Sequence, residues 1–519
     1  MYHSVAAIER GIAYVVALPL VAESKLLNGS NTNPDLMSLP KQNPTRSFWL
    51  NKNPLANYRT TPNLPEKANI VIIGSGLTGT GALFTLSQKH PDLCITVLEA
   101  RDPASGATGR NGGHLTPAAF RHFRSHSKIY GAKAAYLNRL LERHNADQLV
   151  KLINECSIDC DLQEGTGNLE CFFDAREFAE AKLDLEAYRE IDKQFGGHLV
   201  KDIEVWEKET KMGLTDVYGA ILIPAHQLWP AKLCWSIQQE CFKNPNVNIQ
   251  SNTPAKNITR LKNSDKWQVE TSRGIIICDV VLHASNAWSG RLLPTQISKI
   301  LVPTRAQVLA FKSPQDDTVN VEEWTRGFTA HNGGEYMVRR RRDGTYILGG
   351  GRNYIPGQQM YEDDDSVLNE AVGKALRNVM LGDFPGLLPE HEEAYQEWTG
   401  IMCYTLDGRP VIGEVPDVSG QYVAIGYNGH GMPFGFQSGA YIADQAALYL
   451  NSDKTLPSND FEKHDYVMEA WQQYDPKRFQ SYASSKHEPF TTETQETLDI
   501  VDITFSAYPS SCLLLLSIN

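Results

Sequence analysis

The stretch GIMCYTLDGRPVIG, residues 400–413, carries three side chains whose types and spacing could do chemistry. Cys403, Asp407 and Arg409 place a thiol, a carboxylate and a guanidinium within seven residues. A thiol can act as a nucleophile or tether a cofactor, and a guanidinium can hold a carboxylate through two parallel hydrogen bonds. Which of these functions the stretch performs depends on the elements that position it.

The clearest of those elements spans residues 69–99. An apolar segment from Ile70 predicts a buried parallel strand, and Gly74, Gly76 and Gly79 follow it in the spacing G-x-G-x-x-G. A helical segment and a second strand come next, and the second strand ends at Glu99, 20 residues beyond the third glycine. Strand, glycines, helix, strand and acid in this order predict a dinucleotide-binding βαβ unit, with a glycine-rich turn of an unrelated α/β protein as the alternative.

Each part of this unit has its own physical reason. Gly74 permits the tight turn, Gly76 lets a pyrophosphate approach the backbone, and Gly79 lets the helix pack closely on the strand. The helix N-terminus offers N–H groups and a partial positive charge to phosphates, and an acid at the end of the second strand can bind ribose hydroxyls. The expected dinucleotide contacts are Gly74, Ser75, Gly76, Leu77, Thr78, Gly79, Glu99 and Ala100.

The same strand–glycine–helix order returns late in the chain, at residues 421–450. Between the two copies lie a second glycine-rich loop (101–117), helical patterns at 132–155 and 175–194, several strands within 247–285, and a hairpin turning at Asp343-Gly344. Dinucleotide-type elements therefore occur at the start, middle and end of the body, which predicts a discontinuous nucleotide domain with another domain threaded through it.

Several motifs in this order resemble the D-amino-acid oxidase superfamily of FAD-dependent oxidoreductases. They are IVIIGSGLTG…VLEA, GATGRNGGHL, QLWPAKL, VVLHASNAW, YILGGG, WTGIMCYTLDGRPVIG and VAIGYNGHGM. The lead-in LPKQNPTRSFW…YRTTPNLP is similar to that of the γ-glutamylputrescine-oxidase-like branch, to which the chain is therefore nearest. The resemblance covers roughly residues 40–450 and includes glycine and sarcosine oxidases. The order and spacing of the motifs are more specific than any one of them.

The resemblance implies a fold of α/β and α+β type. A glutathione-reductase-type Rossmann domain would bind FAD and lie beside a substrate domain built on an antiparallel sheet. The implied parts are an extension or targeting segment, peripheral to the fold or disordered (1–36), a lead-in (37–65), the FAD-binding domain (66–130, 225–295 and 396–450), the substrate domain (131–224 and 296–395) and a C-terminal tail (451–519).

Further site residues are carried over from the resemblance. Arg101 would lie by the adenosine, or else be an exposed charge after a strand. The flavin side of the second loop would be lined by Arg110, Asn111, Gly112, Gly113 and His114. The start of the late helix would face the flavin N1/O2 edge through Gly429, His430, Gly431 and Met432. His430 would stabilise negative charge on reduced flavin or on superoxide, or would simply cap the loop.

The family reaction moves a hydride from a carbon bearing an amine to flavin N5, and oxygen then accepts the electrons and yields hydrogen peroxide. Relatives carry an arginine for the substrate carboxylate where this chain has Met402, so a simple amino acid becomes a less natural substrate unless Arg409 or one of 339–342 substitutes. Relatives that tether flavin use a cysteine near Cys403 or a histidine near His114, but both contexts differ here. We therefore expect non-covalent rather than covalent FAD.

Composition narrows the remaining choices. The chain carries 61 acidic against 49 basic residues, which argues against a nucleic-acid partner, and its basic run 339–342 predicts a solvated hairpin. Nine scattered cysteines without a CxxC pair predict reduced, mostly buried thiols and no metal site. The apolar run 11–22 is too short to span a bilayer. We expect a cytoplasmic or peroxisomal protein without integral membrane contact, or a secreted one if residues 1–22 act as a signal peptide.

Three hypotheses follow. The leading one is an FAD-dependent enzyme that oxidises a C–N bond of a small amine or amino-acid derivative, with O2 as acceptor. The alternative is a flavin dehydrogenase or tailoring oxidoreductase that acts on a larger metabolite and uses another acceptor. The third is a flavin-binding protein without turnover, or a structural subunit of a larger oxidase. The sequence leaves the substrate and the oligomeric state open.

Overall fold

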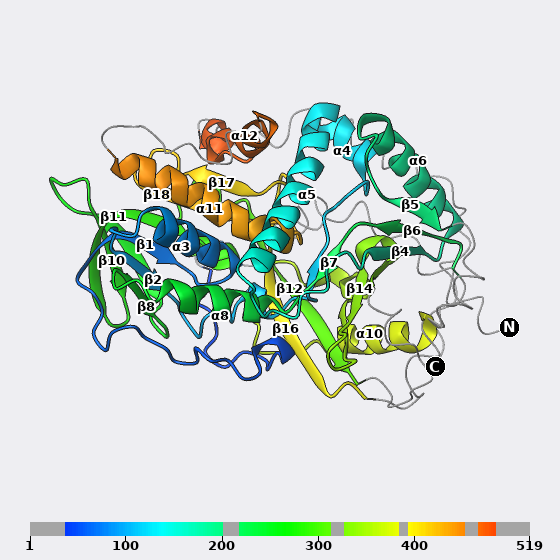
Figure 1. Ribbon diagram of the computed structural model, residues 1–519, viewed down its shortest axis with the longest axis horizontal. Coiled ribbons are helices and arrows are strands. Elements are labelled where there is room, and N and C mark those ends of the chain that lie inside the picture. Colours follow the sequence, from blue (N-terminus) through cyan, green and yellow to red (C-terminus); the bar gives the residue numbers. More distant parts are fainter. Residues whose placement is uncertain (1–36, 201–216, 313–325, 384–392, 452–464, 484–519) are drawn as a thin grey trace, which may run out of the picture.

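The computed structural model describes residues 37–200, 217–312, 326–383, 393–451 and 465–483. The predicted N-terminal extension 1–36, including the apolar run 11–22, lies outside the described residues, as does most of the predicted tail. Figure 1 shows a parallel sheet with its helices at one end of the molecule and a second sheet at the other.

The first sheet has eight strands in the order β17-β18-β11-β1-β2-β8, with β10 beside β11 and β9 beside β10. Its strands are β1 (Lys67–Ile73), β2 (Ile95–Leu98), β8 (Val247–Gln250), β9 (Ala255–Arg260), β10 (Trp267–Thr271), β11 (Gly274–His283), β17 (Val411–Glu414) and β18 (Gln421–Ile425). The path from β18 through β11, β1 and β2 to β8 is parallel throughout. Segments from the start, middle and end of the chain therefore form one sheet, which confirms the predicted discontinuous arrangement of nucleotide-type elements.

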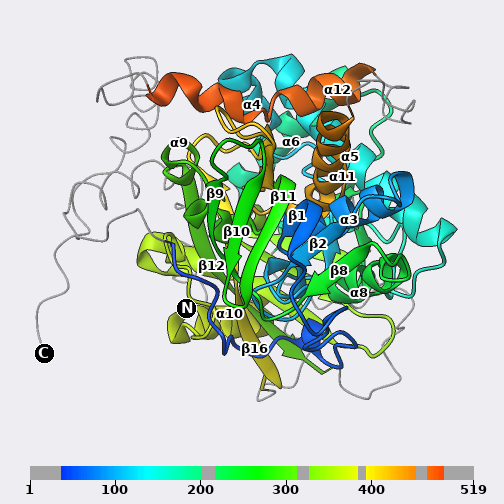
Figure 2. The same cartoon turned by 90° about the vertical axis from the view of Figure 1, so that its left-hand side faces the viewer.

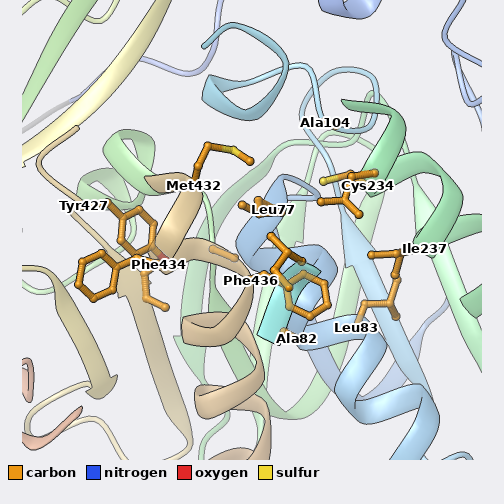
Figure 3. Close-up of a cluster of buried hydrophobic side chains, with 14 of the residues drawn as sticks. Leu77, Ala82, Leu83, Ala104, Cys234, Ile237, Tyr427, Met432, Phe434 and Phe436 are labelled. Carbon is orange, nitrogen blue, oxygen red and sulfur yellow. The ribbon is translucent and has the colours of Figure 1, made fainter. Parts of the chain in front are cut away.

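Three helices gather on one side of this sheet (Figure 2): α3 (Leu77–Lys89), α8 (Pro230–Cys241) and α11 (Gly431–Leu450). Helices α3 and α11 cross in backbone contact because glycines lie at the crossing. A Cβ on Gly439 would lie 1.9 Å from the carbonyl oxygen of Thr78, and one on Gly81 would lie 2.1 Å from that of Phe436. Apolar side chains, including Leu77, Ala82 and Phe436, fill the space around the crossing (Figure 3).

The second sheet also has eight strands, in the order β16-β12-β15-β14-β13-β4-β6-β5. Its strands are β4 (Asn168–Phe172), β5 (His198–Val200), β6 (Gly219–Ile223), β12 (Leu301–Phe311), β13 (Gly327–Ala330), β14 (Glu335–Arg339), β15 (Tyr346–Gly350) and β16 (Gln396–Thr405). Neighbours are antiparallel except β13 and β4, which run parallel. Strand β16 belongs to this second sheet, although the predicted FAD-binding segment 396–450 includes it. The division into domains stays a prediction.

The remaining elements connect and cover the two sheets. They are η1 (Phe48–Leu50), η2 (Ala107–Gly109), β3 (His114–Leu115), α4 (Phe123–Tyr130), α5 (Ala132–Glu155), α6 (Ala175–Ile191), β7 (His226–Gln227), η3 (Asn286–Arg291), α9 (Thr295–Ser298), η4 (His331–Gly333), η5 (Arg352–Tyr354), η6 (Pro356–Gln359), α10 (Glu370–Asp383), α12 (Asp465–Gln472) and η8 (Pro476–Ala483). Helix α5 has the predicted bounds, and α6 ends three residues before the predicted 194. The buried face of α5 joins the same core cluster as α3 and α11.

The basic run 339–342 corrects one prediction. Its hairpin forms as expected between β14 and β15, and Arg341 and Arg342 are exposed as predicted, but Arg339 and Arg340 are only 3% and 4% exposed, so only half of the run is solvated. The guanidinium of Arg340 lies 4.6 Å from the ring centroid of Trp229 and donates to Asp161. Aromatic faces and a carboxylate together compensate the burial of this charge.

The prediction of reduced and mostly buried thiols is confirmed for the described cysteines. All eight described cysteines are free, six of them are buried, and Cys94 and Cys156 are exposed. No helix in the described part of the chain is both long and apolar enough to cross a membrane.

Candidate active site

One cavity, of about 380 Å³, is lined by residues from both large sheets and from the helices between them. It collects almost all the predicted site residues, namely Gly74, Ser75, Gly76, Leu77, Thr78, Glu99, Ala100, Arg101, Arg110, Asn111, Gly112, His114, Met402, Gly429, His430, Gly431 and Met432. Gly79 and Gly113 are not part of its lining. These two glycines have packing roles: a Cβ on Gly79 would lie 1.9 Å from the carbonyl oxygen of Gly74, and one on Gly113 would lie 2.9 Å from the ring of Trp49.

The first glycine loop is ordered by the acid that ends β2. One carboxylate oxygen of Glu99 accepts hydrogen bonds from the backbone N–H of Ser75 at 3.0 Å and from its hydroxyl at 2.7 Å. The other accepts the N–H of Arg101 at 2.9 Å. Gly74 has φ +101°, a conformation that favours glycine, and turns the chain from β1 into α3. The turn thus presents the N-terminus of α3 to the cavity.

Arg101 and Arg110 share one buried carboxylate. Arg101 donates to both oxygens of Asp365 at 3.0 and 2.9 Å, and Nε of Arg110 lies 3.5 Å from the same group. Asp365 is fully buried and Arg101 is 5% exposed, so Arg101 is not the exposed charge that the sequence left open. Burial lowers the pKa of Arg110 to about 10. Asp365 therefore connects the second glycine loop to the segment that follows η6.

The second glycine loop is fixed mostly by its own polar groups. The side chain of Asn111 accepts the N–H of Gly113 at 2.8 Å and donates to the carbonyl of Thr108 at 3.0 Å. Burial lowers the pKa of His114 to about 4, so its imidazole is neutral near pH 7. Nε2 of His114 is buried without a hydrogen-bond partner among the described residues and lies 3.2 Å from the position that a Cβ on Gly327 would take.

The N-terminus of α11 forms the far wall of the cavity. Gly429, at φ +89°, turns the chain from β18 into this helix, and His430 is the residue that precedes the first helical turn. Nδ1 of His430 lies 3.1 Å from a carboxylate oxygen of Glu142, which also accepts the N–H of Ala118 at 2.7 Å. Since a carboxylate accepts, Nδ1 donates, and the ring is held in one orientation. The Glu142 side chain is 3% exposed and that of His430 is 32% exposed.

Strand β16 supplies the wall that carries the opening stretch GIMCYTLDGRPVIG. Met402 and Tyr404 are half-buried, and because alternate residues of a strand share a face, both side chains lie on the cavity side. Cys403, between them, also borders the cavity, but its side chain belongs to an apolar cluster with Leu301 and Phe479. Burial raises the pKa of the Cys403 thiol to about 12, which suppresses the thiolate that a nucleophile or tether needs.

Three arginines of this cavity were not singled out from the sequence: Arg121, Arg291 and Arg352. Arg352 follows β15 and donates to the phenol oxygen of Tyr404 at 3.0 Å, and Arg121, before α4, forms an ion pair with Glu170. The predicted substitute Arg409 lies outside the cavity, ion-paired with Asp407 at 3.3 Å. The only sequence signal for Arg352 was its place directly after the GGG of YILGGG, and nothing local indicated which way it would point.

The comparison with known families decides the identity of this fold and site. Residues 69–445 match the family described as "DAO: FAD dependent oxidoreductase", which is well over half of the chain. The chain belongs to this family of FAD-dependent oxidoreductases. The family prediction from the sequence is thereby confirmed, together with the fold class, the enzyme class and FAD as the cofactor.

Relatives agree with the family assignment. γ-Glutamylputrescine oxidoreductase of Escherichia coli is 23% identical over 388 residues, covering 74% of this chain and 84% of that protein. Glycine oxidase of Bacillus subtilis is 23% identical over 389 residues, covering 74% and 93%. Among solved structures, glycine oxidase from Geobacillus kaustophilus superimposes with a TM-score of 0.60 at 19% identity, covering 77% of this chain and 98% of that one, a likeness of fold.

The residues that line the cavity fit FAD. A Cβ on Gly76 would lie 2.9 Å from Thr108 Oγ1, which accepts the N–H of Leu77 at 2.9 Å, so a larger residue at this position would crowd the loop at the start of α3. The N-termini of α3 and α11 both reach the same cavity and offer N–H groups to an anionic dinucleotide. The close contact of the two helices at Gly81 and Gly439 fixes the positions of their N-termini relative to each other.

Proposed function

We propose that this enzyme oxidises a C–N bond of a small amine or amino-acid derivative and uses O2 as the electron acceptor. When bound, FAD supplies the two-electron acceptor, taking a hydride at N5 and passing the electrons to O2 to give hydrogen peroxide. The amine loses two electrons and two protons in all, and water then hydrolyses the resulting imine. The names of the relatives, an oxidoreductase of γ-glutamylputrescine and glycine oxidases, support an amine or amino-acid substrate.

The proposed cofactor contacts divide between the two ends of the cavity. The N-terminus of α3 with Gly74, Ser75 and Gly76 would hold the pyrophosphate, and Glu99 would accept from the adenosine ribose. The second loop, through Asn111 and its neighbours, would line the flavin side. Arg101 and Arg110 would shape this site rather than bind phosphate, because Asp365 already engages both guanidinium groups. FAD would be held non-covalently, since the Cys403 side chain is buried in an apolar cluster and burial raises the pKa of its thiol to about 12.

His430 is the residue we place at the charged edge of the flavin. It stands at the start of α11, where the helix end and an imidazole N–H can both stabilise developing negative charge. Glu142 would keep Nδ1 protonated and leave Nε2 as the remaining nitrogen of the ring. No side chain need act as a general base, provided that the amine enters the cavity neutral.

One observation carries the proposal: Met402, Tyr404, Arg352 and His430 line the same cavity as the glycine loop of the βαβ unit. A substrate placed against β16 would therefore lie next to the N-terminus of α11. The test is anaerobic mixing of the purified yellow protein with a panel of amines and amino acids, followed through the flavin absorbance, and then admission of air with peroxide detection. A protein that cannot be loaded with FAD, or whose flavin no amine bleaches, would contradict the proposal.

A dehydrogenase is the second candidate because solved relatives include one. L-proline dehydrogenase from P. horikoshii superimposes with a TM-score of 0.59 at 20% identity. Bleaching by an amine without peroxide on admission of air, but with turnover through an artificial electron carrier, would favour this candidate over an oxidase.

A further inference from the structure

A segment of the lead-in covers one side of the cavity. Residues 37–47 contain no helix or strand, and two of them, Leu39 and Pro40, line the cavity. Figure 2 shows the lead-in in blue. The family match begins only at residue 69, so this segment lies outside the part of the chain that matches the family. Its contacts with the cavity are therefore a feature of this chain that the family assignment does not supply.

The segment lies at the end of the cavity that we assign to the adenosine of FAD. The carbonyl of Lys41 accepts from Nη1 of Arg101 at 3.3 Å, and Arg101 comes two residues after Glu99, the proposed ribose contact. Further along, Sδ of Met37 lies 2.8 Å from the position that a Cβ on Gly290 would take, in η3, which also lines the cavity. The segment thus spans the cavity from the end of β2 to η3.

The inner end of the segment is firmly anchored. The N–H of Thr45 donates to the carbonyl of Asp365 at 2.8 Å, and the carbonyl of Thr45 accepts from Arg110 at 2.8 Å. Trp49, which is 1% exposed, donates through Nε1 to the carbonyl of Asn111. Buried hydrogen bonds to the second glycine loop and to its counter-charge hold this end in place.

The outer end is held by a contact near the surface. The backbone N–H of Ser38 and its hydroxyl donate to the same carboxylate oxygen of Asp363, at 2.9 and 2.8 Å. Both residues are half-buried, and neither of these two described residues lines the cavity. A segment with few buried contacts opens locally at a lower cost than the whole fold. Residues 37–41 can therefore move away from the cavity while Thr45 stays in place.

We propose that residues 37–41 form a clasp that closes over the adenosine end of bound FAD, and that the contact between Ser38 and Asp363 is the latch that sets how fast FAD enters and leaves. Because the two latch residues contact each other and not the cavity, a weaker latch should accelerate entry and exit alike. A wall that only touched the cofactor would change exit and affinity instead. The proposal depends on FAD as the cofactor and not on the substrate or the electron acceptor.

The first test measures FAD exchange. Dilution of the FAD-loaded protein, followed through the fluorescence of released flavin, gives the dissociation rate constant, and mixing FAD with protein freed of it gives the association rate constant. The variants are Asp363→Ala, which removes both latch hydrogen bonds, Ser38→Ala, which removes one, and Leu39→Ala, which removes part of the wall. Asp174→Ala is the matched control, because one oxygen of Asp174 also accepts two hydrogen bonds and this residue does not line the cavity.

Asp363→Ala should raise both rate constants at least about 10-fold, with a smaller change in the dissociation constant, since two hydrogen bonds to a charged group are lost. Ser38→Ala should raise both about 3-fold. Leu39→Ala should accelerate dissociation and weaken affinity while association stays near that of wild type. Asp174→Ala should exchange FAD at the wild-type rate.

The second test uses the wild-type protein. Lys41 lies in the clasp, so trypsin should cleave after it mainly when the clasp is open, whereas Lys262, exposed in the turn between β9 and β10, serves as an internal reference. Cleavage after Lys41 should be several-fold slower in the FAD-loaded protein than in the protein freed of FAD, and cleavage after Lys262 should not change. In Asp363→Ala, cleavage after Lys41 should be faster in both states.

Three results would overturn the proposal. The first is FAD dissociation from Asp363→Ala and Ser38→Ala at the wild-type rate, or equal acceleration in Asp174→Ala. The second is faster dissociation from Asp363→Ala with unchanged association, which would leave a static wall without a latch. The third is equal cleavage after Lys41 with and without FAD in wild type, a result that no folding defect of a variant can affect. None of these results bears on amine oxidation, so the clasp can fail while the proposed function stands.

Discussion

The carboxylate of Glu142 lies 3.1 Å from Nδ1 of His430, although the two residues are 288 positions apart in the chain. Glu142 comes from the middle of α5 and His430 from the start of α11, so the contact joins the connecting helix to the proposed flavin edge. The carboxylate is nearly inaccessible to water, which strengthens its interaction with a nearby donor. This contact fixes the orientation of the His430 ring at the cavity.

Glu142→Gln should slow flavin reduction without loss of FAD. Glutamine keeps an oxygen for the N–H of Ala118 and for Nδ1 but removes the negative charge, which converts a charged hydrogen bond into a neutral one. The difference is about 1 kcal/mol, which corresponds to a roughly 5- to 10-fold lower rate if it is expressed in the transition state. Anaerobic stopped-flow mixing with a saturating amine measures this rate.

Asp192→Asn is the matched control. Asp192 is also a buried carboxylate, it accepts from Arg143 at 2.6 Å, and it does not line the cavity. Both variants should lower thermal stability, but only Glu142→Gln should slow flavin reduction. Equal slowing in both would mean that Glu142 acts only through stability.

The local parts of the fold could be predicted from the sequence, and the long-range partners could not. Glycine spacing and apolar runs located β1, α3 and β2, and helical periodicity gave the bounds of α5, because these signals depend on neighbouring residues. Arg340 of the run 339–342 was expected to be solvated because its aromatic partners, Phe48 and Trp229, come from the lead-in and from the residue before α8, more than a hundred residues away. Arg352 was not predicted as a cavity residue for the same reason, because the direction of its side chain depends on how the second sheet packs.

Cys403 should resist alkylation in the folded protein. Burial raises the pKa of its thiol to about 12, so the thiol remains protonated up to about pH 11, and its side chain packs among apolar residues. Iodoacetamide at pH 8 should modify the exposed Cys94 and Cys156 within minutes and leave Cys403 intact, as read by peptide mass spectrometry. Raising the pH to 9.5 should not change this for Cys403. Modification of Cys403 in the native protein, or covalently bound flavin on its peptide, would contradict the structure's placement of this thiol.

Asp365 should be one of the most sensitive positions for stability. Asp365→Asn removes the charge that faces Arg101 and Arg110 and leaves two buried guanidinium groups without a counter-charge. Removal of one partner from a buried pair typically costs about 3–5 kcal/mol, so the free energy of unfolding should fall by that order. Denaturant unfolding followed by tryptophan fluorescence measures the change, and FAD affinity should fall with it because Arg110 anchors the second glycine loop.

The neighbouring Asp364→Asn provides the comparison. Asp364 is half-buried and accepts hydrogen bonds from Ser366, so the substitution should cost at most about 1 kcal/mol. A similar loss in both variants would show that the segment, rather than the shared carboxylate, determines the effect.

The crossing of α3 and α11 should not tolerate a methyl group. In Gly439→Ala the new Cβ would lie 1.9 Å from the carbonyl oxygen of Thr78, a backbone atom that cannot move aside without separating the helices. Overpacking of this kind costs about 1–3 kcal/mol or more. It would also shift the two helix N-termini that share the cavity, so FAD affinity should fall.

Gly382→Ala in α10 is the control, because its Cβ would meet nothing within 4 Å and alanine favours a helix by up to about 1 kcal/mol. Thermal unfolding should therefore show a lower stability for Gly439→Ala and an unchanged or higher stability for Gly382→Ala. FAD titration should show weaker binding in Gly439→Ala only. If Gly439→Ala retains wild-type stability and FAD affinity, then the close crossing does not fix the geometry of the site.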